Sequence, residues 1–353
     1  MMVPELGVIE GYYGAPWPWA AREETVRVLA PHGYRFFLYA PKADPFLRRR
    51  WQEDHPPQTA EALRRLAKVC ASQGVRFGVG LSPFEIYRDF GAAAKDALAR
   101  KLAALDDLGV EHLAILFDDM RGDLDGLADT QAAIMHWIAE RTGAARIVVC
   151  PTYYSDDPGL DRAFGARPDG YLERFGAALD PAIDIFWTGE EVCSREYSPG
   201  HLERVARQLR RKPMLWDNYP VNDGPIMGQS LHLRAFTGRP AAIGAHLSGH
   251  AVNPALQPVL SRIPAITLAE SYAMAGEYQY GAAFERAAIE VLGPDLARTV
   301  RRHLSLLQNT GLDRLGDAAA RLRQRYAAVD HDGAREIVAW LDGAYQIDPA
   351  EME

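Results

Sequence analysis

Short apolar segments alternate with amphipathic segments from the N-terminus to about residue 265, and this alternation restricts the fold more than any other feature. Most of the apolar segments end in a polar loop, after which a helical periodicity begins. The predicted strands are residues 7–10, 35–40, 76–81, 113–117, 146–150, 183–187, 213–216 and 241–248. Eight strands that alternate with helices, without a break in composition, are typical of a (β/α)8 TIM barrel of roughly 250 residues. The sequence therefore predicts an α/β barrel.

The pattern changes after the eighth predicted strand. From about residue 266 the chain has no strand candidate, and its amphipathic segments predict helices over residues 277–292, 294–308, 312–329 and 334–345. The helix predicted after the seventh strand, residues 228–235, is short. We therefore predict a barrel domain over residues 1–265, which would hold the active site, and a small α-helical C-terminal domain over residues 266–353. The surfaces of these helices could support a homodimer.

Composition excludes several classes of function. The net charge of -8 leaves no basic face for nucleic acid. No apolar run approaches the roughly 20 residues of a membrane span, and the N-terminus lacks the basic and apolar regions of a signal peptide. Cys70, Cys150 and Cys193 are too widely spaced for a zinc motif or a disulfide framework. These features predict a cytoplasmic protein with no nucleic-acid or membrane partner.

Two adjacent carboxylates follow the fourth predicted strand. Residues 113–117 are continuously apolar, as in a strand buried on both faces, and Asp118 and Asp119 come directly after them. Active sites of parallel α/β folds lie at the carboxyl ends of the strands. Two like charges in a closed pocket do not both ionise easily, so we expect one raised pKa, which suits a general acid. The alternative is that an aspartate here caps the next helix.

The ends of the other predicted strands carry side chains that suit a sugar. They are Tyr12, Tyr13, Lys42, Tyr154, Trp187, Trp216, Asn218, Asp223 and Asn253. A barrel would bring them to one rim, where amides, carboxylates and a lysine can bind hydroxyl groups while aromatic rings pack on the apolar face of a sugar. The chain has no serine–histidine–acid order, phosphate-binding glycine loop or strong metal cluster. We predict a carbohydrate ligand, no cofactor and no metal.

The adjacency of Asp118 and Asp119 bears on the mechanism. Most glycosidases place two carboxylates on opposite sides of the scissile bond, roughly 5 to 9 Å apart, which neighbouring residues cannot easily do. Adjacent carboxylates suit substrate-assisted catalysis, in which the 2-acetamido oxygen of the sugar attacks the anomeric carbon. One aspartate would orient the amide and the other would protonate the leaving oxygen, so the latter should begin protonated. Cys150, Tyr154 and Trp216 could line the pocket for the acetamide methyl group.

Seven short motifs occur in order at the predicted strand ends. They are Glu10-Gly-Tyr-Tyr-Gly-Ala-Pro-Trp, Tyr39-Ala-Pro-Lys, Leu116-Phe-Asp-Asp, Cys150-Pro-Thr-Tyr-Tyr, Phe186-Trp-Thr-Gly, Trp216-Asp-Asn-Tyr-Pro-Val-Asn-Asp and Asn253-Pro. Over about residues 5–265 the chain thereby resembles glycoside hydrolase family 84, the β-N-acetylglucosaminidases that include the protein O-GlcNAcases. The resemblance implies a retaining hydrolase that removes terminal β-linked GlcNAc from a glycoside or a glycoprotein through an oxazoline intermediate.

The resemblance also implies roles for individual residues. Asp118 would orient the amide, and Asp119 would be the general acid/base. Tyr154 and Asn218 would hold the acetamido group, and Trp216 would wall the pocket. The hydroxyl groups of the sugar would contact the Gly11 backbone, Lys42, Asp223 and Asn253.

Two alternatives to a hydrolase site remain. Asp118 and Asp119 could bind Mg²⁺ together with Asp123 and Asp125, because hard cations prefer oxygen ligands. The chain could also be a non-catalytic carbohydrate- or glycopeptide-binding barrel, which would have no need of a buried proton donor. Hydrolysis of a chromogenic β-N-acetylglucosaminide separates an enzyme from a binding module.

Overall fold

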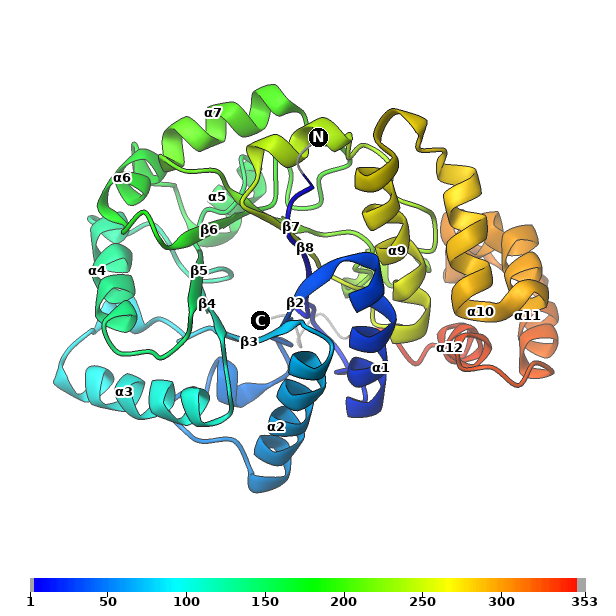
Figure 1. The fold of residues 1–353 in the computed structure, drawn as a ribbon, viewed down its shortest axis with the longest axis horizontal. Coiled ribbons are helices and arrows are strands. Elements are labelled where there is room, and N and C mark those ends of the chain that lie inside the picture. Colours follow the sequence, from blue (N-terminus) through cyan, green and yellow to red (C-terminus); the bar gives the residue numbers. More distant parts are fainter. Residues whose placement is uncertain (1–2, 348–353) are drawn as a thin grey trace.

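The computed structural model describes residues 3–347. Eight parallel strands follow one another around a closed barrel, and β1 pairs with β8 to complete it (Figure 1). The strands are β1 Leu6–Ile9, β2 Tyr34–Tyr39, β3 Arg76–Leu81, β4 His112–Leu116, β5 Arg146–Cys150, β6 Asp184–Trp187, β7 Met214–Asp217 and β8 Gly249–Val252. The predicted (β/α)8 barrel is confirmed.

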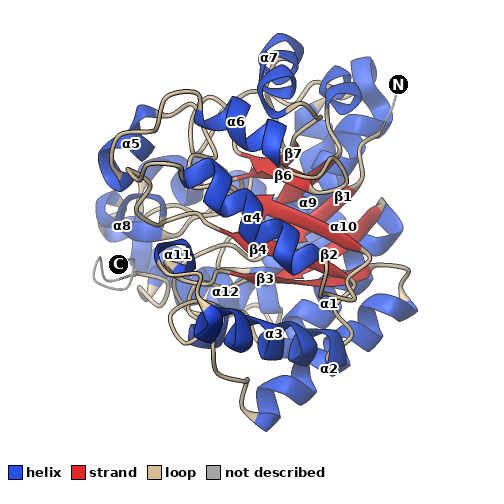
Figure 2. Ribbon diagram, turned by 90° about the vertical axis from the view of Figure 1, so that its left-hand side faces the viewer, coloured by secondary structure: helices blue, strands red, loops and turns tan. Residues whose placement is uncertain are grey.

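Helices surround the strands on the outside of the barrel, as Figure 2 shows. They are α1 Trp19–Leu29, α2 Pro57–Ser72, α3 Ala92–Asp107, α4 Leu127–Ala139, α6 Tyr171–Ala178, α7 Pro199–Leu209 and α9 Pro258–Met274. Two short helices, α5 Pro158–Phe164 and α8 Gly224–Met227, lie instead beyond the strand ends, on the side of the loops. None of the helices within residues 3–347 combines the length and the apolar character that crossing a membrane requires.

Burial on both faces explains why the strands consist of continuous apolar runs. All five residues of β4 are buried, because helices cover its outer face and barrel side chains cover its inner face. In the register of β4 with β5, Leu116 lies opposite Cys150, and the Phe117 N–H donates to the Cys150 carbonyl at 2.9 Å. The loops after these two strands therefore begin at the same level of the barrel, which brings their side chains together.

The prediction of a strand over residues 241–248 is wrong. Ala241–His246 form a 3-10 helix, and β8 begins only at Gly249. An apolar run cannot by itself distinguish a strand from a buried helical turn, and alanine and glycine, which fill much of this run, do not favour strands. Inside the barrel β8 places His250, whose Nε2 lies 3.0 Å from the buried Asp217 carboxylate.

The prediction of a helix over residues 228–235 is also wrong. The helical turn of this region is α8, and residues 228–235 form turns and loop after it. Two of their backbone groups bond to distant partners: the Leu231 N–H donates to the Leu307 carbonyl at 2.9 Å, and the Gln229 carbonyl accepts from the Leu312 N–H at 2.7 Å. These bonds replace those that a local helix would make.

Three further helices, α10 Tyr280–Ser305, α11 Asp317–Ala327 and α12 Asp332–Leu341, lie beside α9 on the outside of the barrel (Figure 1). The two helices predicted over residues 277–308 are joined as α10, with a kink at Gly293, where φ is +74°. The predicted domain boundary at residue 265 falls inside α9, which packs against α1. We propose that the division lies after α9, and we call residues 280–347 the C-terminal helical segment.

Candidate active site

All ten predicted site residues line one cavity of about 210 Å³. The cavity lies where the strands end at their carboxyl termini, and its walls come from the ends of β1, β2, β4, β5, β7 and β8. The ten are Gly11, Lys42, Asp118, Asp119, Cys150, Tyr154, Trp216, Asn218, Asp223 and Asn253. Their proximity is a property of the barrel, whereas their roles in binding and catalysis stay predictions.

Asp118 and Asp119 both face the cavity although they are neighbours in the chain. Successive side chains of an extended chain point to opposite sides. Asp119 instead adopts a left-handed backbone conformation with φ of +56°, which is uncommon for a residue other than glycine and concentrates at functional sites. A guanidinium N–H of Arg48 donates to the Asp119 carbonyl at 3.3 Å and supports this conformation.

Lys42 lies between the two carboxylates. Its ammonium group forms an ion pair with Oδ2 of Asp118 and is 3.3 Å from Oδ2 of Asp119. Burial of the Lys42 side chain opposes its charge, but the two aspartates outweigh this effect and raise its pKa above the usual range. Lys42 is therefore a permanent cation of this site and contacts both carboxylates directly.

The expectation of a raised pKa at Asp119 is contradicted. Burial alone would raise the pKa of this carboxyl, but the cations of Lys42 and Arg48 and a hydrogen bond from Tyr13 hold it below its usual value. The Tyr13 hydroxyl donates to Oδ2 at 2.8 Å, and the Tyr154 hydroxyl donates to Oδ1 at 3.4 Å. This arrangement favours the ionised form of Asp119. The expectation failed because Asp119 is adjacent in sequence to another carboxylate, whereas only the fold brings the two cations to it.

Asp118 keeps one acceptor free. Its Oδ2 is paired with Lys42, whereas its buried Oδ1 accepts no hydrogen bond from any described residue. A buried polar atom without a partner is costly, and native structures rarely leave one unsatisfied. This oxygen is therefore suited to accept an N–H group from a molecule in the cavity.

Cys150 and Tyr154 form an uncharged wall near the carboxylates. Burial raises the pKa of the Cys150 thiol, and the charge of Asp118 raises it further. Burial and then the charges of Asp119 and Asp118 raise the pKa of Tyr154 in the same way. Both side chains therefore stay neutral at physiological pH.

A chain of hydrogen bonds fixes the opposite wall. The Gly11 N–H donates to Oδ1 of Asn253 at 3.1 Å, and Nδ2 of Asn253 donates to Oδ1 of Asn218 at 2.9 Å. Nε1 of Trp216 donates to the same Asn218 oxygen at 3.0 Å. Position 11 must be a glycine, because a Cβ atom there would lie 2.0 Å from Cζ2 of Trp216. The indole ring thus packs directly on the backbone after β1.

Asp223 connects two of the loops. Its Oδ2 accepts a hydrogen bond from the Tyr13 N–H at 2.8 Å. Burial raises the pKa of the Asp223 carboxyl, and the nearby charge of Asp119 adds to this effect. The pKa of Asp119 is therefore lowered, whereas the pKa of Asp223, on another loop of the cavity, is raised.

The cavity is also lined by residues that were not among the ten predicted, and two residues predicted at the rim do not line it. Tyr13 contacts both Asp119 and Asp223, and its place in an aromatic loop after the first strand was a signal for it. Two more lining residues, Thr188 and Val221, lie within the motifs at the strand ends. The others carried no such signal: Val192, Cys193 and Met227. Tyr12 and Trp187 do not line the cavity, because their polar atoms bond to Glu10 and His201 in the buried interior.

The acidic residues proposed for a magnesium site are not brought together. Asp123 forms an ion pair with Arg121 at 2.6 Å and lines a separate hollow with Asp125. Across residues 3–347 there is no group of three or more His, Cys, Asp or Glu side chains placed to hold a metal ion. The ammonium group of Lys42 already lies between Asp118 and Asp119, where a metal would have to bind.

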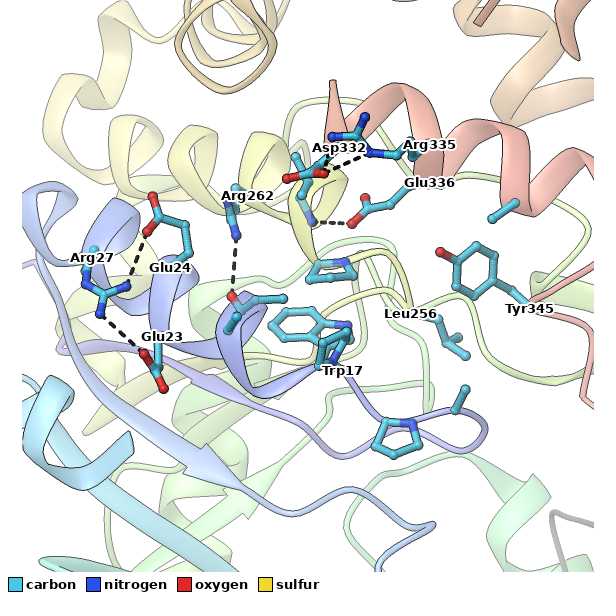
Figure 3. A pocket seen from close by; sticks show the side chains of 18 residues that line it. Trp17, Glu23, Glu24, Arg27, Leu256, Arg262, Asp332, Arg335, Glu336 and Tyr345 are labelled. Carbon is cyan, nitrogen blue, oxygen red and sulfur yellow. Dashed lines mark hydrogen bonds and ion pairs between the residues drawn. The ribbon is translucent and has the colours of Figure 1, made fainter. Parts of the chain in front are cut away.

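A larger groove, of about 800 Å³, lies between α1, the start of α9 and α12 (Figure 3). It contains none of the predicted site residues. On one side of it, the two oxygens of Glu336 accept hydrogen bonds from the Val259 and Leu260 N–H groups at 2.8 and 2.9 Å. This carboxylate therefore caps the first turn of α9 and attaches α12 to the barrel.

The chain is similar to known proteins over most of its length. Residues 6–305 match the beta-N-acetylglucosaminidase family. The protein O-GlcNAcases of Rattus norvegicus and Mus musculus are each 30% identical to this chain over 275 residues, which are 75% of this chain and 30% of the relative. This chain thus spans less than a third of the length of these curated relatives.

A mutant of the O-GlcNAc hydrolase of Thermobaculum terrenum has a TM-score of 0.80 and 27% identity, covering 97% of this chain and 81% of that one. Because the family match extends over most of the sequence, the chain belongs to the beta-N-acetylglucosaminidase family of glycoside hydrolases.

Proposed function

We propose that this protein is a retaining β-N-acetylglucosaminidase that removes terminal β-linked GlcNAc by substrate-assisted catalysis. Family membership supports the hydrolase class, and the names of the similar proteins support GlcNAc on serine or threonine of a protein as the substrate. The single observation that carries the mechanism is the pair Asp118 and Asp119 on one wall, with Oδ1 of Asp118 unpaired.

The size of the cavity supports a single sugar ring as its occupant. Sites for drug-sized ligands have volumes of roughly 300 to 1,000 Å³, whereas this cavity has about 210 Å³. One side offers the indole of Trp216 for the apolar face of the ring, and Asn218 and Asn253 offer amides for its polar groups. The rest of the substrate would then lie outside the cavity.

In the first step, the free Oδ1 of Asp118 accepts the acetamido N–H of the substrate, while Lys42 holds Oδ2. The acetamide oxygen attacks the anomeric carbon, and the bond from that carbon to the leaving oxygen breaks. Asp119 gives its proton to the leaving oxygen, and a cyclic oxazolinium ion forms, whose N–H stays hydrogen-bonded to Oδ1 of Asp118. In the second step, Asp119 accepts a proton from water, which attacks the anomeric carbon and opens the ring. Two inversions retain the anomeric configuration.

The proposed reaction begins from the protonated form of Asp119, whereas the surrounding cations favour its carboxylate in the empty cavity. The Asp119 side chain is 23% exposed, and a bound sugar would cover it. Loss of water disfavours the charged form, so substrate binding raises the pKa of Asp119 toward the value that a general acid needs.

We take the remaining contacts from the resemblance to the family, and the residues concerned line the cavity. Tyr154 and Asn218 hold the acetamido group, and Asp223 and Asn253 bind the outer hydroxyl groups. The N–H of Gly11 already donates to Asn253, so we assign the hydroxyl contact of Gly11 to its carbonyl oxygen.

Replacement Asp119→Asn tests the assignment of the acid. With an alkyl leaving group, which needs protonation, kcat should fall by about 10² to 10⁴. With a dinitrophenyl leaving group, which departs unprotonated, the fall in the first step should be much smaller. Asp107→Asn, at an exposed position on α3, is the matched control and should leave kcat unchanged for both substrates.

Equal losses for good and poor leaving groups would show that Asp119 is not the acid. A plain β-glucoside should be almost inert, because it has no acetamide to act as the nucleophile. A covalent adduct on an aspartate or glutamate, trapped with a fluorinated sugar and found by mass spectrometry, would refute the substrate-assisted mechanism. Sugar binding without turnover by the wild-type chain would favour the non-catalytic binding barrel.

A further inference from the structure

The segment between β7 and β8, residues 218–248, forms one wall of the cavity but has little regular structure. It contributes Asn218, Val221, Asp223 and Met227 to the lining. Its helices are short, since α8 has four residues and Ala241–His246 form a 3-10 helix of six. Helices of this length are not stable on their own. Contacts with other elements must therefore hold this wall in place.

Those contacts come from the C-terminal helical segment. Among the described residues, every hydrogen bond that joins residues 224–234 to an element outside residues 218–248 has its partner within residues 307–346. The Leu231 N–H donates to the Leu307 carbonyl at 2.9 Å, the Leu312 N–H donates to the Gln229 carbonyl at 2.7 Å, and Oε1 of Gln308 accepts from the N–H groups of Leu233 and Arg234, each at 2.9 Å. Helices outside the barrel thus hold part of the wall of its cavity.

Trp340 makes the contact next to α8. Its side chain, on α12, is fully buried, and its indole N–H donates to the Gly228 carbonyl at 3.0 Å. Nε2 of Gln346 donates to the same carbonyl at 3.2 Å. Gly228 also closes α8, because its N–H donates to the Gly224 carbonyl at 3.0 Å. The position of α8 therefore depends on α12.

Asp223 immediately precedes α8, so its carboxylate moves with that helical turn. The Asp223 carboxylate accepts a hydrogen bond from the Tyr13 N–H, and Tyr13 lies in the loop after β1. The C-terminal helical segment also packs against this loop. Ile347 is buried against Gly14, where a Cβ atom would lie 2.8 Å from its Cδ1. Residues of the C-terminal helical segment thus pack behind both partners of the bond between Tyr13 and Asp223.

We propose that Trp340 is a positioning residue for sugar binding, which acts through Gly228 and α8 on Asp223. The inference rests on the proposed function, in which Asp223 binds the outer hydroxyl groups of the sugar. Without the indole N–H, the Gly228 carbonyl keeps only the longer bond from Gln346, and α8 is held less firmly in place. Asp118 and Asp119 follow β4 on a separate loop, so their chemistry stays intact. The C-terminal helical segment is in this sense part of the sugar site.

The test is Trp340→Phe in the full chain, which removes the indole N–H and keeps an aromatic ring. The Kd of a thiazoline analogue of GlcNAc, measured by calorimetry, and the KM of an aryl β-N-acetylglucosaminide should both rise by about threefold to tenfold, the loss expected for one hydrogen bond. The kcat should change by less than about twofold, since the lost contact binds substrate and transition state alike. Trp137→Phe on α4 is the matched control and should change neither constant.

Two further measurements separate positioning from a general loss of structure. Gln346→Ala removes the second donor to Gly228 from an exposed side chain, and it should raise Kd in the same direction by a smaller factor. In an Asp223→Ala background, Trp340→Phe should cause no further rise in Kd, because the residue through which it acts is gone.

The proposal is overturned if Kd and KM are unchanged in Trp340→Phe, if only kcat falls, or if the rise in Kd persists in the Asp223→Ala background. A wild-type chain that binds the thiazoline analogue but shows no turnover refutes the hydrolase function, and the binding measurements still decide the role of Trp340.

Discussion

Replacement Lys42→Met should raise the pH at which activity is lost on the alkaline side. In the proposed mechanism, activity falls there because Asp119 loses the proton that it donates, and the Lys42 ammonium favours that loss from a distance of 3.3 Å. Two unit charges at this distance interact by about 5 kcal/mol at an effective dielectric constant of about 20, and by about 1.3 kcal/mol at about 80. One pH unit corresponds to about 1.36 kcal/mol, so the limits are about four and one units.

Partial exposure of Asp119 to solvent places the expected shift in the lower part of that range, at about one to two pH units. The direction is upward, because removing a cation favours the protonated carboxyl. The assay is kcat against pH at saturating substrate, with an alkyl β-N-acetylglucosaminide whose released sugar is quantified by chromatography. Lys68→Met, at an exposed position on α2, is the control and should leave the profile unchanged.

An alkaline limb that does not move in Lys42→Met, or that moves to lower pH, would refute the reasoning. In that case Lys42 would not set the proton equilibrium of Asp119, and another group would be responsible for the limb.

Three further changes test other parts of the site. Asp118→Ala should lower kcat by the same factor for good and poor leaving groups, because the proposed role of Asp118 is in cyclisation; a loss confined to poor leaving groups would contradict that role. Gly11→Ala should force Trp216 out of place at a cost of about 1 to 3 kcal/mol, seen as a raised KM, and an unchanged KM would mean that the ring does not wall the sugar. Arg239→Met leaves the buried Asp217 without the guanidinium to which it is bound by two hydrogen bonds, and should lower the free energy of unfolding by about 3 to 5 kcal/mol in urea titrations. A change of less than about 1 kcal/mol would show that this ion pair is not structurally important.

The sequence by itself determined the barrel and the set of ten residues that gather at its rim. Strands of a parallel barrel are buried on both faces, so they appear as apolar runs that can be counted, and seven of the eight predicted runs overlap observed strands. Parallel topology carries every strand end to the same rim. All ten predicted residues at those ends therefore meet in one cavity whatever the details of the helices, whereas the motif residues Tyr12 and Trp187 face the interior.

Local signals failed where a segment is stabilised by distant contacts. Residues 228–235 have a weak helical pattern, but the Leu231 N–H and the Gln229 carbonyl bond to Leu307 and Leu312. The sequence pattern assigns these two partners to a separate helical domain. The eighth strand was misplaced for a related reason, because an apolar run indicates burial and does not distinguish a strand from a helical turn.

Only the tertiary structure decided the electrostatics of the site and the role of the C-terminal helical segment. Adjacency in sequence puts Asp119 beside another acid, but its pKa depends on Lys42, 77 residues away, and Arg48, which the fold brings to it. The hydrogen bond from Trp340 to Gly228 joins residues 112 positions apart. Such effects depend on distances of a few ångströms between side chains. A linear pattern of residue types carries no information about those distances until the chain has folded.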